Sequence, residues 1–145
     1  MATWKEFAQQ TPELAAYGVT RFKSEVAYFA TVREDGSPRV HPVTPIVGDR
    51  LFLFMEPTSP KGRELERDGR YALHCSVEDS SGGKGEFWVR GRASRTVDPI
   101  DRADATAASP YTPEERYIVF VLSIDEAFMK QYGPPATTHR WRAPS

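Results

Sequence analysis

The spacing of apolar residues divides the chain into a short helical start and a longer region typical of strands. Thr3 and Glu6 have the spacing of a capping box, and Thr11-Pro12-Glu13 places proline at the first position of a second helix. These signals predict two short helices, at roughly residues 3–9 and 11–22. Their buried stripe would be supplied by Leu14, Tyr17 and Phe22.

Beyond these helices, short runs of strand-forming residues alternate with turn signals such as Asp35-Gly36 and Gly48-Asp49. One further helix is expected to begin at Asp98-Pro99 and to end near Ser109-Pro110. Many short strands with few helices predict a mostly β fold, a barrel or a sandwich with peripheral helices. The expected strands are residues 26–33, 39–47, 51–55, 71–77, 86–97, 117–124, 128–132 and 138–142.

Composition narrows the class of protein without identifying a function. The 145 residues are expected to form a single domain, 1–145. Nineteen basic and 20 acidic residues give a net charge of -1, so neither nucleic acid nor a membrane surface is an expected partner. Cys75 is the lone cysteine, no apolar run is long enough to span a bilayer, and no signal-peptide pattern is evident. A soluble, cytoplasmic protein is therefore the expectation.

The segment Pro57–Leu65 contains the first candidate for binding chemistry. Ser59 suits an N-cap and Pro60 the first position of a helix, which would leave the N–H groups of Lys61 and Gly62 free. Lysine at a helix start opposes the helix dipole, and an anion bound there would reverse that penalty. A solvated lysine on a surface helix explains the same residues equally well.

The segment Gly36–Pro45 contains a second candidate. Alternation places Arg39, His41 and Val43 on one face of the expected strand. Pro42 and Pro45 cannot donate ladder hydrogen bonds, which predicts an unpaired edge. Such an edge could pair with a planar heterocycle through the backbone near Val43, although an ordinary edge strand protected by proline is the simpler interpretation.

The third candidate is the cluster His139-Arg140-Trp141-Arg142 near the end of the chain. It could close over an aromatic, anionic ligand, or it could be a tail anchored by Trp141 alone. The histidines lack metal-ligand spacing, so no metal site is expected. The sequence also lacks the Walker, G-x-G-x-x-G and G-x-S-x-G motifs.

Together these segments resemble the pyridoxamine 5'-phosphate oxidase-like, FMN-binding split-barrel superfamily. The resemblance lies in the order and spacing of residues 27–40, 51–55, 59–65 and 87–93. It implies a split β-barrel with peripheral helices that binds FMN at the interface of a homodimer. An apolar run in the fifth strand, Phe87-Trp88-Val89, is consistent with a surface covered by a second subunit.

The resemblance also implies which residues contact FMN. Arg39 and Lys61 correspond to ligands of the FMN phosphate, with Ser59 beside them. Val43 and Thr44 correspond to backbone positions along the edge of the isoalloxazine ring.

Further residues correspond to the ribityl end of the site and to its cover. Phe54 and Met55 match the strand end that borders the ribityl chain. Glu86 lies where the oxidases place a glutamine that reaches the flavin from the other subunit. The tail resembles the cap that closes over the cofactor, through Arg140, Trp141 and Arg142.

The chain departs from the true oxidases at three points. Thr44 and Pro60 replace a lysine and a phosphate-binding arginine, and the tail lacks the Arg-x-His pattern for the substrate phosphate. The resemblance therefore implies an oxidoreductase that moves hydride between FMN and a small planar substrate, rather than the vitamin B6 reaction. The alternatives are a deazaflavin (F-420)-dependent reductase and a non-catalytic flavin-binding or sensing protein. Some short relatives bind haem, for which three scattered histidines are a poor match.

Overall fold

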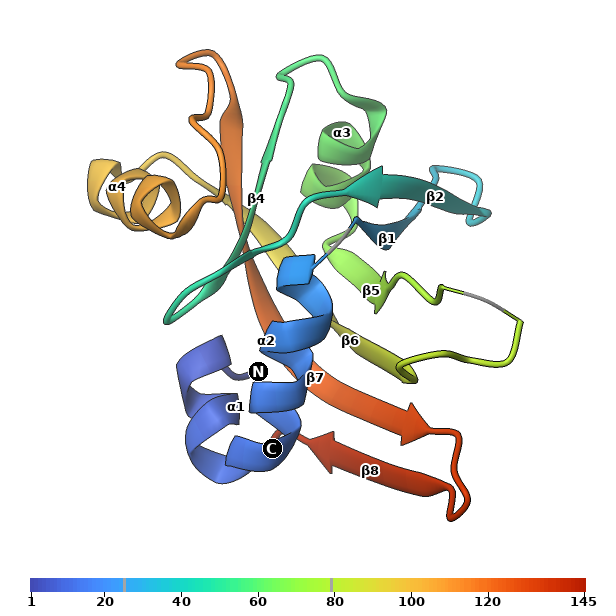
Figure 1. Ribbon diagram of the computed structural model, residues 1–145. Coiled ribbons are helices and arrows are strands. Elements are labelled where there is room, and N and C mark those ends of the chain that lie inside the picture. The colour runs from blue at the N-terminus through green and yellow to red at the C-terminus, as the bar shows by residue number, and fades with distance from the viewer. Residues whose placement is uncertain (25, 79) are drawn as a thin grey trace.

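The computed structural model describes residues 1–24, 26–78 and 80–145. In this part of the chain, one curled antiparallel sheet has the strand order β2-β1-β5-β6-β7-β4-β3, and β8 pairs with β7 (Figure 1). The strands are β1 (Ala27–Val32), β2 (Pro38–Val43), β3 (Ile46–Val47), β4 (Leu51–Met55), β5 (Arg70–Cys75), β6 (Glu86–Thr96), β7 (Ile118–Gln131) and β8 (Thr137–Arg142). The helices are α1 (Trp4–Gln10), α2 (Pro12–Ser24), α3 (Pro60–Arg67) and α4 (Pro99–Ala108).

The mostly β split-barrel fold predicted from the sequence is confirmed, with two corrections to individual strands. The strand expected at 39–47 breaks at Thr44-Pro45 into β2 and β3, because proline cannot continue the ladder. The two strands expected at 117–124 and 128–132 are one strand, β7. Asp125 and Glu126 interrupt the apolar pattern of this strand, but Glu126 is buried and paired with arginines, so the strand continues through it.

Side chains on both faces of β4 are buried, which explains its uninterrupted apolar sequence. Leu51, Leu53 and Met55 belong to the main core, which α1 and α2 cover with Trp4, Phe7 and Phe22. Phe52 and Phe54 point to the other side, into a smaller cluster completed by α4. The apolar residues expected for α2 are placed as predicted, since Leu14 and Phe22 are buried and Tyr17 packs against the core.

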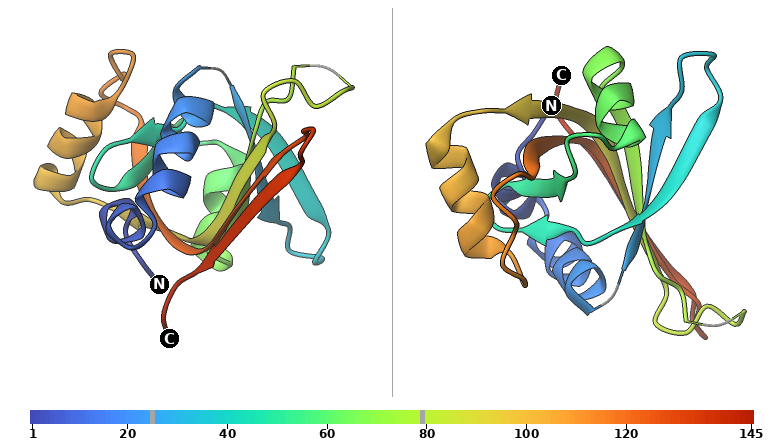
Figure 2. Two further views of the ribbon diagram at one scale, coloured as in Figure 1. Left: turned by 60° about the horizontal axis from the view of Figure 1, so that its bottom comes forward. Right: turned by 90° about the horizontal axis from the view of Figure 1, so that it is seen from above.

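The sheet is split because its two end strands, β2 and β3, do not pair within the described residues. β3 contacts only Leu51 and Phe52 of β4, so residues 53–55 have β7 as their one ladder partner in this part of the chain. α3 follows β4 directly and stands between the end of β4 and the β1–β2 hairpin (Figure 2, right). The split therefore brings together the free edge of β2 and the start of α3.

The outer face of the sheet carries a continuous row of large side chains. The strand register aligns Tyr28, His74, Trp88, Phe128 and Arg140 across five neighbouring strands. The Trp88 and Phe128 rings stack at 5.5 Å, and Tyr28 is 48% exposed.

This row corrects the surface expected from the sequence. Phe87 and Val89 are fully buried in the core, so Trp88 alone of that run reaches the outer face. The alternation of the strand separates the three residues. No helix in the described part of the chain has the length and apolarity needed to cross a membrane.

Candidate functional site

The start of α3 presents a lysine and a serine to the split. Ser59 is the N-cap in an extended conformation, and Pro60 occupies the first turn, as the sequence predicts. The Ser59 hydroxyl makes no capping hydrogen bond, and instead accepts one from the Lys61 ammonium at 2.9 Å. Gly62 N–H donates to the Ser59 carbonyl at 3.1 Å, so the expectation that this amide is free was wrong. The polar side chains, rather than a row of free amides, define this end of the site.

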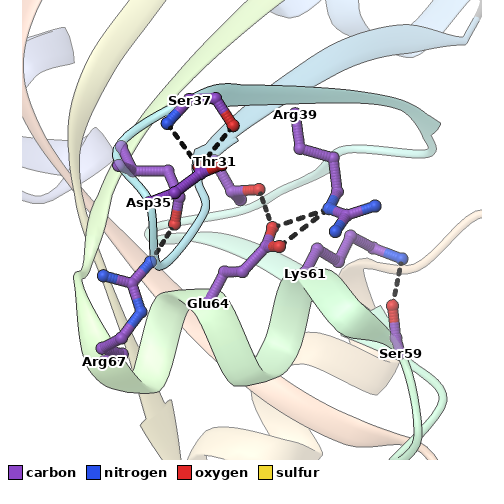
Figure 3. Close-up of polar contacts among 9 residues, drawn as sticks. Thr31, Asp35, Ser37, Arg39, Ser59, Lys61, Glu64 and Arg67 are labelled. Atoms are coloured by element: carbon purple, nitrogen blue, oxygen red, sulfur yellow. Dashed lines mark hydrogen bonds and ion pairs between the residues drawn. The ribbon is translucent and has the colours of Figure 1, made fainter.

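Arg39 on β2 reaches the same region and is held there by a buried carboxylate (Figure 3). Its Nε donates to both carboxylate oxygens of Glu64, at 2.9 and 2.8 Å. Thr31 donates to the same carboxylate at 2.6 Å. Burial opposes ionisation of Glu64, but the hydrogen bonds from Thr31 and Arg39 outweigh it and lower its pKa. Because Arg39 uses only Nε for hydrogen bonds with the described residues, its two terminal nitrogens remain available on the side that faces Lys61.

His41 is a further part of this site that the sequence interpretation did not include. Its Nε2 is buried and makes no hydrogen bond with any described residue. Burial lowers the pKa of His41, and the nearby charges of Lys61 and Arg39 lower it further. Its alternation with Arg39 on β2 was the available signal, since the two side chains share one face of the strand.

These groups form a donor set that suits a phosphate. Lys61 is half-buried, and burial lowers its pKa because the charged form loses solvent. An anion would offset that cost through charge-assisted hydrogen bonds from Lys61 and from the terminal nitrogens of Arg39. It would also give the buried His41 nitrogen a partner, which a buried polar atom needs. The residues present therefore fit the phosphate group of FMN.

The other end of β2 is suited to an apolar ring. At about 3.3 Å per residue, the strand carries the chain roughly 16 Å from Arg39 to Thr44. A pocket of about 490 Å³ begins there and is lined by Thr44, Pro45 and mostly apolar side chains of α2, β3 and α4. β2 is an edge strand, as predicted, so its outer backbone groups at Val43 and Thr44 are not used by the sheet in the described residues.

Phe54 and Met55 lie beside this region, but their side chains are buried elsewhere. Phe54 packs edge-on against Tyr111 at 6.3 Å and lies under the Arg102 guanidinium at 5.5 Å. The Met55 sulfur lies close to Gly62, and the residue belongs to the main core. Backbone groups of these two residues, rather than their side chains, could border a ligand.

Glu86 and the tail are not brought together with Lys61 within one chain. They lie on the part of the sheet away from α3 (Figure 1). Glu86 Oε1 is 3.7 Å from His74 Nε2. Contact between these residues and a ligand at Lys61 would require a second chain.

The tail residues themselves have partners in their own chain. The Trp141 ring packs on Phe7 at 4.9 Å, and its Nε1 donates to Gln10 at 3.1 Å. Arg140 and Arg142 point to the opposite face and donate to the buried carboxylate of Glu126, at 2.9 and 3.3 Å. The alternation of β8 thus separates the tryptophan from the two arginines.

Solved structures with the same fold include flavin-binding and haem-binding proteins. A pyridoxamine 5'-phosphate oxidase-related FMN-binding protein from Nostoc punctiforme matches with a TM-score of 0.68 and 13% identity, over 94% of this chain and 92% of that one. A NimC/NimA family protein from Clostridium acetobutylicum matches with a TM-score of 0.66 and 14% identity, over 94% and 96% of the two chains. A haem-binding protein from Mycobacterium smegmatis matches with a TM-score of 0.65 and 21% identity.

The last match covers 83% of this chain and 53% of the other, so the chain spans about half the length of that haem-binding protein. No protein-family model matches the sequence, and no curated protein matches it significantly. The chain thus has the split-barrel fold of the pyridoxamine 5'-phosphate oxidase-like proteins, and the resemblance predicted from the sequence is confirmed at the level of the fold.

Proposed function

We propose that the protein binds FMN in the split of the barrel and acts as a flavin-dependent oxidoreductase on a small planar substrate. The observation that carries this proposal is the donor set around Ser59: the Lys61 ammonium, the unused nitrogens of Arg39 and the buried Nε2 of His41. Each of these groups would donate a hydrogen bond to a phosphate. Bound FMN would supply the hydride chemistry, which the side chains themselves do not provide.

The remaining residues would position the ring of the flavin. The free backbone edge at Val43 and Thr44 would pair with the polar edge of the isoalloxazine, and the adjoining apolar pocket would exclude water from one side of it. Phe54 and Met55 would contribute backbone groups beside the ribityl chain.

Glu86 and the tail would act from a second subunit in this proposal. The start of β6 and β8, which carry Glu86 and the residues Arg140, Trp141 and Arg142, lie away from α3, so in this proposal they reach the flavin across a dimer interface. The outer row that contains Trp88 and Phe128 is an apolar surface that such an interface would bury. The protein is therefore proposed to be a homodimer with the cofactor at the interface.

The haem-binding neighbours suggest a rival ligand, and the site favours the flavin over it. No histidine lines the pocket at Thr44. His74 pairs with Glu86 at 3.7 Å, and His139 contacts Thr11 at 3.4 Å. The three histidines therefore have separate surroundings in the described structure.

A comparison of FMN with riboflavin tests the proposed site. Hydrogen bonds to a charged phosphate contribute roughly 1.5–3 kcal/mol each, so two of them should make FMN bind about a hundredfold more tightly than riboflavin. Lys61→Gln should reduce this preference to about tenfold or less, and Lys5→Gln, at an exposed position on α1, should leave it unchanged. Fluorescence titration of the apoprotein measures both affinities.

Equal affinity for FMN and riboflavin would refute the phosphate site. Loss of apoprotein stability in Lys61→Gln by more than about 0.5 kcal/mol, with normal FMN affinity, would make the lysine structural. Reduction of the bound flavin by a nicotinamide donor would support the FMN enzyme, whereas tight FMN binding without turnover would support a non-catalytic flavin protein. Preference for the deazaflavin over FMN would favour the F-420-dependent alternative.

A further inference from the structure

A pocket of about 530 Å³ lies beside the proposed phosphate site, between α3 and the β1–β2 turn. On one side it is lined by a helical stripe of α3 with i, i+3, i+4, i+7 spacing, and on the other by the turn. Arg39 lines it at the end nearest Lys61, so the pocket is continuous with the donor set described above. The lining residues are Arg33, Glu34, Asp35, Arg39, Pro60, Arg63, Glu64 and Arg67.

Of the four arginines of this pocket, Arg39 is paired with Glu64, whereas the other three have no ion pair in the described part of the chain. Within the described residues, the side chains of Arg33 and Arg63 make no hydrogen bond or ion pair, and Arg67 donates to the backbone carbonyl of Val32. Several exposed arginines elsewhere are paired with carboxylates, as Arg95 is with Glu66 at 3.0 Å and Arg116 with Glu56 at 2.6 Å. The pocket thus combines four arginines with three carboxylates, and three of its guanidinium groups lack the carboxylate partner that several other exposed arginines have.

Two of the three carboxylates in the pocket are already engaged. Asp35 accepts hydrogen bonds from the Ser37 amide at 2.9 Å and from its hydroxyl at 2.6 Å (Figure 3). Glu64 accepts from Thr31 and Arg39. Both oxygens of Glu64 and one oxygen of Asp35 are therefore engaged, and the guanidinium groups that line the pocket have unused donors.

Helix stability does not favour this arrangement of charges. Arg63 and Arg67 are like charges at i, i+4, which destabilise an isolated helix. Arg63 and Lys61 also lie in the first turn of α3, which contains no acidic residue to complement the helix dipole. Lys61 lies in the donor set beside Ser59, whereas Arg63 lines the pocket. Two basic side chains of the same helical turn therefore lie in two adjacent clusters of donors.

We propose that this arginine-lined pocket is a second anion site, which binds an anionic group joined to the cofactor beyond its first phosphate. The inference rests on the proposed flavin function and extends it. Along β2 and α3, the apolar pocket at Thr44, the donor set at Lys61 and the arginine-lined pocket follow one another. A flavin dinucleotide has its ring, first phosphate and second phosphate in the same order, and guanidinium groups bind phosphate in a bidentate manner.

The ratio of the affinities for FAD and FMN tests this inference. The wild-type apoprotein should bind FAD at least tenfold more tightly than FMN. The double variant Arg63→Gln/Arg67→Gln should lose this preference while its affinity for FMN changes by less than about twofold. Arg70→Gln/Arg95→Gln, which removes two exposed arginines that line neither anion site, should retain the FAD preference.

Several results would overturn the inference and separate it from the flavin proposal. FMN binding as tight as or tighter than FAD binding in the wild type would refute the second site and leave the FMN function intact. Equal loss of both affinities in Arg63→Gln/Arg67→Gln would refute it as well. If pyrophosphate binds to the FMN-saturated protein and the wild type does not prefer FAD, the pocket binds a free anion and not one that is joined to the cofactor. Failure to bind any flavin would refute both proposals together.

Discussion

At the scale of single residues, His41 is the group that should respond most directly to an anion. Its Nε2 is buried without a hydrogen-bond partner, and burial together with Lys61 and Arg39 lowers its pKa below 6.5. A phosphate bound between these residues would offset their charge and accept a hydrogen bond from the imidazole. The pKa of His41 should therefore rise when FMN binds.

The rise in pKa has a defined effect on affinity. A group whose pKa increases on binding takes up a proton, so FMN should bind more tightly as the pH falls through the range between the free and bound pKa values. NMR titration of the His41 ring, with and without FMN, measures both values. A His41 pKa that does not change on binding, or that falls, would place the phosphate elsewhere.

The family resemblance grouped Arg39, Ser59 and Lys61 as a set, and the structure brings them to one end of the split. The buried Glu64 that orients Arg39 could not be selected in the same way. Glutamate at the middle of an amphipathic helix usually faces solvent, and only tertiary contacts with Thr31 and Arg39 account for its burial.

At the scale of elements, the bend in the long β6–β7 ladder depends on a glycine. The register shifts between Arg90 and Gly91, where one extra residue of β7 is accommodated. A Cβ added at Gly91 would lie 2.0 Å from the carbonyl oxygen of Ser123, which is backbone and cannot rotate away. The two strands can approach this closely only because position 91 has no side chain.

Gly91→Ala should therefore destabilise the fold by about 3 kcal/mol or more, a large effect for a single substitution. Chemical denaturation of the apoprotein measures the change in the free energy of unfolding. Ser94→Ala, an exposed position on the same strand, is the matched control and should change it by less than about 0.5 kcal/mol. A Gly91→Ala variant whose free energy of unfolding is nearly unchanged would show that the two strands can separate at the bulge without loss of stability.

The sequence predicted most of the elements, and the exceptions have local causes. Turn residues and caps marked α1, α2, α3, α4 and most strand ends, because they act through the adjacent backbone. β7 was predicted as two strands because Asp125 and Glu126 break its apolar pattern. The neutralisation of Glu126 by arginines from β6 and β8 is a long-range contact, which no local pattern contains.

At the scale of the whole molecule, the proposed site is complete only if a second chain contributes. One chain holds the phosphate donors and the free edge of β2, whereas Glu86 and the tail lie on the part of the sheet away from α3. The outer row of large side chains runs across the sheet from β1 to β8, and the proposed dimer would cover it. The mostly β split barrel could be predicted from the sequence. The separation of the phosphate donors from Glu86 and the tail could not, because it depends on the order of the strands in the sheet.

Native mass spectrometry of the freshly purified protein tests the central claim most directly, because it reports the number of chains and the mass of the bound ligand together. A homodimer that carries two phosphorylated flavin molecules, with the matching yellow absorption, is the predicted result. A monomer that retains the flavin would contradict the shared site, and a protein that carries haem or takes up no flavin would contradict the proposed function itself.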